Sequence, residues 1–202
     1  MIGFYNYTIL LTYLSVASAV FGMTEIIHGR PIVAVVCLMF SGLCDMFDGT
    51  VARMRQRTDV EKRFGIQIDS LADVIAFGVL PAMIGYSAGL NRGIFIVILV
   101  VFVLAALTRL AYFNVMEEII QDKGERRTEY EGLPVTTVAL IVPMIYGFKD
   151  YLGMRFPIVY AAALICISLA FLLKVKVKKL SAWSALIIIG VGLIELIWVL
   201  KK

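Results

Sequence analysis

Charged side chains are scarce in this chain of 202 residues, and long stretches of it have none. Asp, Glu, Lys and Arg make up 17% of the residues, against about 25% in soluble domains, while apolar residues make up 61%. The stretches that lack a charged residue are 1–24, 31–44, 74–91, 93–108, 133–148, 156–173 and 180–194. This composition excludes an ordinary soluble domain and is typical of a membrane protein.

Cysteine and histidine are also rare. Cys37, Cys44 and Cys166 lie inside apolar stretches without the spacing of a metal site, which favours small packing residues over disulfides. The only histidine, His28, lies in a short His-Gly-Arg-Pro segment, where a turn residue is favoured over a ligand. Internal repeats and low-complexity linkers are absent, so we expect one transmembrane domain over residues 1–202.

The apolar stretches predict seven membrane-spanning helices. A spanning helix needs about 20 mostly apolar residues, a length that several stretches reach when their polar flanks lie in the interface. The predicted helices cover about 4–26, 31–53, 66–90, 93–114, 133–150, 156–174 and 181–200. The predicted fold class is therefore all-α, a polytopic membrane helical bundle. The first stretch lacks a basic segment before it, so no cleaved signal peptide is expected.

Basic residues gather in the segments that alternating helices place on one side, at 54–63, 115–131 and 174–179. The opposite segments hold only Arg30, Arg92, Lys149, Arg155 and the C-terminal Lys201 and Lys202. The positive-inside rule predicts that the basic segments and the N-terminus face the cytoplasm. The lysines at 174–179 are interpreted as a topology anchor that attracts anionic lipid headgroups, and no nucleic-acid partner is expected.

Four aspartates lie in or beside the apolar helices: Asp45, Asp48, Asp69 and Asp73. Spacings of three and four residues place each pair on one helical face. Because the pairs lie at the cytoplasmic ends of consecutive antiparallel helices, we expect all four at one depth. Four carboxylates in one pocket repel one another unless cations neutralise them. Hard divalent cations take oxygen ligands, and two ions bridged by shared carboxylates fit this ligand count.

Helix capping, or ion pairing with Arg53, Arg55 and Arg57, is the alternative use of these aspartates. Four acids at these spacings in membrane segments favour the metal site. Small residues nearby, Gly49, Ala52 and Gly65, leave space for a bulky ligand. Arg53 offers a guanidinium fork for phosphate oxygens, so the pattern predicts a site for a diphosphate-bearing substrate.

The pattern Asp45-x2-Asp48-Gly49-x2-Ala52-Arg53-x11-Gly65-x3-Asp69-x3-Asp73 resembles the signature of the CDP-alcohol phosphotransferases. The resemblance implies a helical membrane bundle, a homodimer, and a polar cavity open to the cytoplasm. It implies a six-helix core over about 5–175, with an additional C-terminal helix at about 180–200. It also implies that the four aspartates hold two divalent cations, Mg²⁺ or Mn²⁺, and that Asp73 takes the proton of the acceptor alcohol. The positions implied to bind the nucleotide and its phosphates are Asp48, Gly49, Ala52, Arg53 and Gly65.

Three further stretches, FGIQIDSLADVIAFGVLPA (64–82), RLAYFN (109–114) and EGLPVTTVA (131–139), resemble the membrane-spanning phosphatidylserine synthases. This resemblance implies transfer of a phosphatidyl or archaetidyl group from a CDP-linked lipid to the hydroxyl of L-serine, with release of CMP. The sequence departs from most relatives at Ile68 and Tyr112, and neither departure touches the metal site.

Recognition of serine through its carboxylate favours a guanidinium. Arg109 is the first candidate because an arginine in an apolar segment needs a partner, and Arg126 and Arg127 lie in the adjoining segment. Snorkelling of Arg109 to the membrane interface is the alternative.

Two rival functions remain open at the level of the sequence. The first is the same chemistry with glycerol 3-phosphate or an inositol phosphate as the acceptor. The second is a cation- or proton-coupled transporter, which would also use aspartates within the membrane. Transporters place such sites near the midplane, between repeated halves of the chain, and this sequence shows no repeat.

Overall fold

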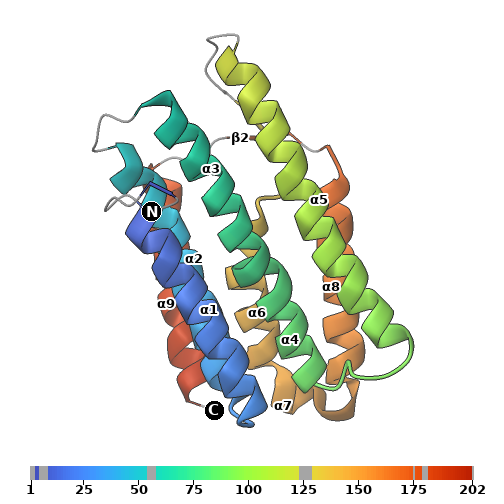
Figure 1. Cartoon of the computed structure of the whole chain (residues 1–202). Helices are drawn as coiled ribbons and strands as arrows, with labels where there is room; N and C mark the ends of the chain where they lie inside the picture. The colour runs from blue at the N-terminus through green and yellow to red at the C-terminus, as the bar shows by residue number, and fades with distance from the viewer. Residues whose placement is uncertain are drawn as a thin grey trace.

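The computed structural model describes residues 3–4, 9–53, 58–122, 129–174, 176–178 and 182–201. Within these ranges, the side chains of 49–53, 121–122, 129–131, 176–178 and 182–187 are not described. The long helices lie side by side along one direction, with short connections at the two ends of the bundle (Figure 1).

The long helices, in chain order, are α1 (Leu10–Ile27), α2 (Pro31–Arg53), α3 (Asp59–Asp73), α5 (Ile94–Asp122), α8 (Phe156–Leu172) and α9 (Ala182–Leu200). A π-helical segment, η2 (Val74–Val79), joins α3 directly to α4 (Leu80–Ser87). The remaining helical segments are η3 (Val135–Thr137), α6 (Val138–Gly147), α7 (Lys149–Leu152) and η4 (Gly153–Arg155).

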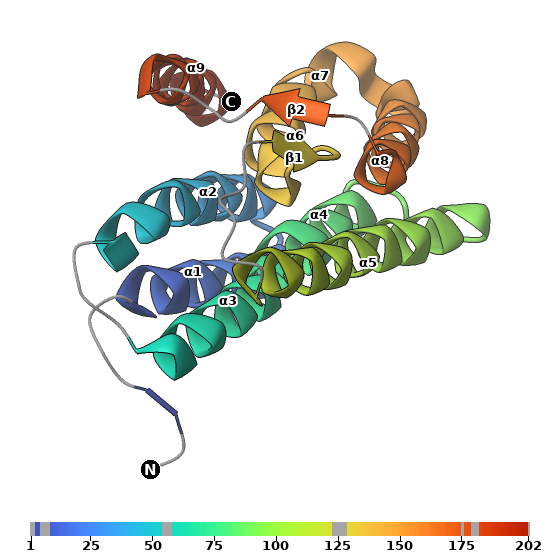
Figure 2. The ribbon, with the colours of Figure 1, turned by 90° about the horizontal axis from the view of Figure 1, so that it is seen from above.

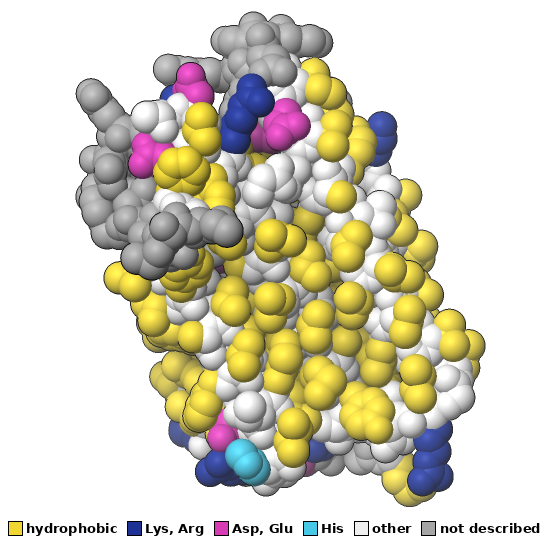
Figure 3. All heavy atoms as spheres, viewed as in Figure 1, with side chains coloured by type: hydrophobic (Ala, Val, Ile, Leu, Met, Phe, Trp, Pro, Cys, Tyr) yellow, Lys and Arg dark blue, Asp and Glu magenta, His cyan; other side chains and the backbone are white. Residues whose placement is uncertain are grey.

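Five helical stretches are long and apolar enough to cross a membrane: Leu10–Ile27, Pro31–Asp48, Asp59–Ser87, Ile94–Ile120 and Lys149–Leu172. Two shorter apolar stretches, Val135–Gly147 and Ile188–Leu200, accompany them. Apolar side chains cover the middle of the face in Figure 3, and charged side chains lie towards the two ends. The predicted polytopic helical membrane fold is confirmed.

The largest errors in the predicted helix boundaries concern two helices, both at the end of the bundle that carries the basic segments. The third helix begins at Asp59 instead of 66, because Thr58 and Glu61 form a capping box. Thr58 accepts a hydrogen bond from the Glu61 N–H (3.3 Å), and the Thr58 N–H donates to a Glu61 carboxylate oxygen (2.9 Å). Helix α5 continues to Asp122 instead of ending at 114. The prediction followed the apolar stretches, whereas both helices extend into polar sequence.

A two-stranded antiparallel sheet, which the sequence did not predict, lies at the same end. Strand β1 (Glu129–Glu131) pairs with β2 (Lys176–Lys178). The register places Glu129 opposite Lys178 and Glu131 opposite Lys176, so acidic and basic positions face each other across the ladder. The sheet joins the α5–α6 connection to the α8–α9 connection (Figure 2).

Close packing of small residues sets the distance between α2 and α6. A Cβ atom added at Gly42 would lie 2.5 Å from the Cβ of Ala139. The two helices therefore approach more closely than larger side chains allow, as is common between membrane helices. Fully buried apolar side chains, among them Phe77, Phe102 and Val138, fill the space between α2, η2, α5 and α6.

Candidate metal centre

Three carboxylates from two helices form a compact cluster. Asp45 and Asp48 lie in α2, and Asp69 lies in α3. Each offers one oxygen, and the three oxygen atoms lie within 4.8 Å of one another. Each of the three residues is half-buried, so the cluster lies below the surface but remains reachable. Among the residues that the structure describes, this is the group of His, Cys, Asp and Glu side chains arranged to hold a metal ion.

Asp73 lies one helical turn after Asp69 and is the last residue of α3. Its side chain is buried, with 8% of its surface exposed. The Asp73 carboxyl group is close enough to interact electrostatically with Asp45, Asp48 and Asp69. Asp73 therefore lies beside the cluster but is not one of the three residues whose oxygen atoms lie within 4.8 Å of one another, and its role as a metal ligand stays a prediction.

The ligand atoms of the cluster are all oxygen. Cys44, which is buried on α2 beside this region, is not part of it. A set of carboxylates without thiolate or imidazole suits hard cations such as Mg²⁺ and Mn²⁺ better than zinc. The residues present therefore fit the divalent cations that the sequence predicted.

The helix that carries Asp69 and Asp73 changes its winding directly after them. Residues Val74–Val79 form a π-helical segment, whose hydrogen bonds close over one residue more than those of an α-helix. Its middle residues Ala76, Phe77 and Gly78 are buried. Such widened turns occur frequently at functional sites, and this one directly follows Asp73.

A buried hydrogen-bond network fixes α3 against α5 at the level of the cluster. The Ser70 hydroxyl donates to the Asn114 side-chain oxygen at 2.8 Å, and the Asn114 amide donates to the Gln67 side-chain oxygen at 3.1 Å. Ser70 and Asn114 are each 9% exposed. Because Ser70 follows Asp69 directly, the network holds the rotation of α3 that turns Asp69 towards α2. No role was predicted for Asn114, although it lies in the RLAYFN stretch that resembles the phosphatidylserine synthases.

The predicted nucleotide positions lie on either side of the cluster in the sequence. Gly49, Ala52 and Arg53 lie in the last turns of α2, whose side chains at 49–53 are outside the described part of the chain. Gly65 lies on α3, one turn before Asp69, and is half-buried. Their contacts with a nucleotide stay predictions.

Arg109 is buried, with 7% of its surface exposed, so the snorkelling alternative is wrong. Its guanidinium donates from Nε to the Leu133 carbonyl at 3.4 Å and from Nη2 to the Gly132 carbonyl at 3.5 Å. Arg109 stays inside because these carbonyls and the face of the Phe113 ring, 5.9 Å from the guanidinium carbon, surround it. Arg126 and Arg127 lie outside the described residues.

Gly132 makes this arrangement possible. Its φ angle is +78°, a conformation that glycine adopts without strain, and a Cβ there would lie 3.1 Å from the Leu173 carbonyl oxygen. The chain continues from Gly132 into η3, which packs against α2, η2 and α5. Arg109 and Gly132 therefore place the segment 133–137 beside α2, which carries Asp45 and Asp48, and beside η2, which directly follows Asp73.

Known proteins resemble this chain over much of its length. The sequence pattern of the CDP-alcohol phosphatidyltransferase family matches residues 5–191. The chain is 43% identical over 109 residues to the CDP-diacylglycerol–serine O-phosphatidyltransferase of Saccharomyces cerevisiae, which covers 52% of this chain and 38% of the relative. It is 33% identical over 165 residues to the archaetidylserine synthase of Methanothermobacter thermautotrophicus, which covers 80% of this chain and 67% of the relative.

A third relative, the CDP-diacylglycerol–serine O-phosphatidyltransferase of Helicobacter pylori, is 36% identical over 132 residues, or 62% of this chain and 52% of the relative. The alignments therefore span between 38% and 67% of the length of these three proteins. The family is generally dependent on divalent cations, in agreement with the all-oxygen cluster. Since the family pattern covers most of the chain, and three aspartates of the acidic signature form one cluster, this protein belongs to the CDP-alcohol phosphatidyltransferase family.

Proposed function

We propose that this protein transfers the phosphatidyl or archaetidyl group of a CDP-linked lipid to the hydroxyl of L-serine and releases CMP. The observation that carries the proposal is the cluster of Asp45, Asp48 and Asp69, whose carboxylate oxygens lie within 4.8 Å of one another. The buried Asp73 lies one helical turn after Asp69. The names of the relatives from yeast, the archaeon and Helicobacter support serine as the acceptor. We treat residues 1–202 as one catalytic unit, with a core at about 5–175 and an additional helix at about 180–200.

The proposed ligands of two divalent cations, Mg²⁺ or Mn²⁺, are Asp45, Asp48, Asp69 and Asp73. When bound, the cations would neutralise the diphosphate of the CDP-linked lipid and the charge that develops on the departing CMP. The protein contributes a rigid frame, because two carboxylates come from α2 and two from α3, and α3 is fixed to α5 by the Ser70–Asn114 hydrogen bond. Such positioning dominates catalysis of phosphoryl transfer.

The proposed reaction is a single in-line displacement at phosphorus. The serine hydroxyl oxygen forms a bond to the phosphorus that carries the lipid, and the bond from that phosphorus to the oxygen bridging to CMP breaks. The electron pair leaves with CMP. Asp73 is proposed to accept the serine proton; its place one turn from Asp69, among the other carboxylates, supports this assignment.

The remaining site residues keep the roles that were predicted from the sequence. Asp48, Gly49, Ala52, Arg53 and Gly65 are proposed to bind the nucleotide and its phosphates. Arg109, Arg126 and Arg127 are proposed to bind the serine carboxylate. For Arg109, its burial and its place beside the segment 133–137 support a role near the acceptor.

The proposed orientation places the acidic cluster at the cytoplasmic side, because the basic segments 54–63, 115–131 and 174–179 gather at that end. Two variants without the native cysteines would each carry one new cysteine, the first at Lys62 and the second at Met154. Labelling of each variant in intact spheroplasts would report which end of the bundle faces the outside. Labelling of only the second by an impermeant maleimide supports the orientation. We further propose a homodimer, which crosslinking in native membranes tests.

The experiment for the activity uses the purified full chain in detergent with CDP-diacylglycerol, or its archaeal ether-linked counterpart, and Mn²⁺ or Mg²⁺. CMP release is measured with L-serine, glycerol 3-phosphate or an inositol phosphate. Asp69→Asn is the test variant, and Asp59→Asn is the matched control, because Asp59 is an exposed residue of the same helix that pairs with Lys62. Serine-dependent release that is lost in Asp69→Asn but kept in Asp59→Asn supports the proposal.

Other outcomes separate the rival functions. Release with only another acceptor keeps the metal centre and rejects serine. No release with any acceptor and either lipid, from folded protein, rejects the transferase and calls for a cation-flux assay in proteoliposomes.

A further inference from the structure

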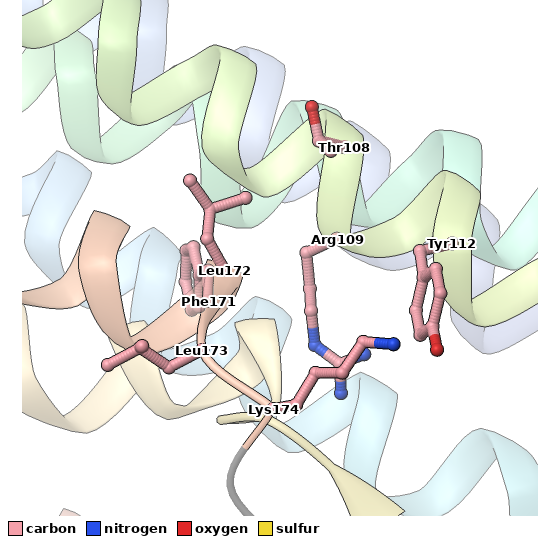
Figure 4. A pocket seen from close by; sticks show the side chains of 7 residues that line it. All are labelled: Thr108, Arg109, Tyr112, Phe171, Leu172, Leu173 and Lys174. Atoms are coloured by element: carbon pink, nitrogen blue, oxygen red, sulfur yellow. The ribbon is translucent and has the colours of Figure 1, made fainter.

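The two helices that carry the carboxylates are supported by different neighbours. Helix α3 is fixed to α5 by the Ser70–Asn114 hydrogen bond. Helix α5 is not closely packed along its whole length, because a cavity of about 140 Å³ lies between it and the end of α8, beside Arg109 and Lys174 (Figure 4). Helix α2 carries the other two carboxylates of the cluster and packs along α1, which contributes no residue to the cluster.

Two side-chain hydrogen bonds and one close contact hold α1 against α2. The Ser41 hydroxyl donates to the Ser15 carbonyl at 3.1 Å, and the Ser18 hydroxyl donates to the Cys37 carbonyl at 3.0 Å. Further along, a Cβ atom added at Gly22 would lie 3.0 Å from the Cβ of Cys37. Small side chains and hydrogen bonds of this kind join helices in membranes. They leave α1 and α2 little freedom to slide or rotate against each other.

Of these contacts, the bond made by Ser41 lies nearest to the acidic cluster along α2. Asp45 follows Ser41 by four residues and Asp48 follows it by seven, so the three side chains share one face of the helix. Ser41 is fully buried and Ser15 is 3% exposed, so solvent does not compete for the bond. A rotation of α2 that broke this bond would also turn Asp45 and Asp48 relative to Asp69.

We propose that Ser41 is a positioning residue of the metal centre, which acts by fixing the depth and rotation of α2 through its bond to Ser15. The proposal rests on the proposed metal ligands and adds a support from α1, a helix that carries none of the proposed site residues. Metal binding is sensitive to such a support, because Mg²⁺ requires oxygen ligands at about 2.1 Å in near-octahedral geometry. A shift of α2 would displace Asp45 and Asp48 together.

The test measures Mn²⁺ binding to the purified full chain in detergent by electron paramagnetic resonance, without a CDP-linked lipid and without serine. Ser41→Ala is the test variant, because it removes the donor and leaves the Ser15 carbonyl in place. Ser15→Ala is the matched control, because the Ser15 hydroxyl is buried at the same contact but has no hydrogen-bond partner among the described residues. Ser18→Ala removes the similar bond one turn further from the cluster. Asp69→Asn, which lacks a proposed ligand, identifies the Mn²⁺ bound at the cluster.

The dissociation constant for Mn²⁺ should rise about fivefold in Ser41→Ala, the order expected for one hydrogen bond between membrane helices, and should not change in Ser15→Ala. Ser18→Ala should lower the unfolding temperature after chelation as much as Ser41→Ala does, with a smaller effect on Mn²⁺ affinity. Ser41→Cys keeps a weak donor of similar size and should lie between the wild type and Ser41→Ala. It decides the question if Ser41→Ala does not fold.

Wild-type Mn²⁺ affinity in Ser41→Ala, or in Ser41→Cys where only that variant folds, overturns the proposal. An equal loss of affinity in Ser41→Ala and Ser18→Ala also overturns it, because it indicates a general loosening of the bundle. A wild-type protein that binds no Mn²⁺ overturns it together with the proposed metal centre. Because neither substrate is present, a failure of serine-dependent CMP release leaves this result unaffected.

Discussion

The Ser70 hydroxyl donates a 2.8 Å hydrogen bond to the side chain of Asn114, which lies 44 residues further along the chain. Both residues are buried, and Ser70 directly follows Asp69 of the acidic cluster. The bond therefore connects α5, which carries no member of the cluster, to the helix that carries Asp69 and Asp73. It makes Asn114 a positioning residue for the carboxylates.

Removal of this bond is expected to weaken the metal centre without dismantling the fold. In Asn114→Ala and Ser70→Ala, the Mn²⁺ concentration for half-maximal CMP release should rise severalfold, because α3 becomes free to rotate Asp69 away from α2. The two substitutions should not add, with a coupling of about 1 kcal/mol in thermal unfolding. Ser87→Ala is the control, since its hydroxyl bonds only the Ile84 carbonyl one turn away. An unchanged metal dependence in both variants would contradict the positioning role.

Divalent cations are expected to stabilise the protein through the cluster. Saturation at one hundred times the dissociation constant adds about 2.7 kcal/mol to the folded state. Thermal unfolding in detergent after chelation should therefore occur at a lower temperature, and Mn²⁺ or Mg²⁺ should restore it. The shift should be lost in Asp45→Asn and Asp48→Asn. A shift of the same size in these variants and in Asp59→Asn would instead point to cations bound elsewhere.

The contact between Gly42 and Ala139 is expected to be intolerant of a single added methyl group. Gly42→Ala would bring two Cβ atoms to 2.5 Å, so α2 and α6 must separate, at a cost of about 1–3 kcal/mol. Because Asp45 lies one turn further along α2, CMP release should fall as well. The double variant Gly42→Ala with Ala139→Gly restores the space and should recover both. Gly190→Ala is the control, since no atom lies within 4 Å of its added Cβ.

An ion pair at the opposite end of the bundle is expected to affect stability alone. Glu25 is 4% exposed and binds Arg30, with 2.6 Å between its carboxylate and the Arg30 Nε. Arg30→Gln leaves a buried carboxylate without its cation and should lower the free energy of unfolding by about 1–3 kcal/mol. The Michaelis constants for both substrates should not change, because the residue lies far along the helices from the cluster. Arg92→Gln serves as the comparison, and a changed Michaelis constant only in Arg30→Gln would argue against a purely structural role.

The sequence by itself determined the membrane fold and the members of the acidic cluster. Apolar stretches of spanning length require helices, because a lipid environment leaves backbone groups no partner except one another. The spacings of Asp45 to Asp48 and of Asp69 to Asp73 place each pair on one face, whatever the rest of the chain does. Both are local properties, which a single sequence contains.

Only the tertiary structure decided what the other polar residues contact. Arg109 was predicted to meet a carboxylate or the membrane interface, yet it donates to the carbonyls of Gly132 and Leu133. The Ser70–Asn114 bond, the pairing of β1 with β2 and the cavity beside Lys174 all join segments that are distant in sequence. No periodicity predicts such contacts, because they depend on how helices of different rotation and tilt pack. The aspartates can be predicted from the sequence because their spacing is local, whereas the residues that support them are defined only by the fold.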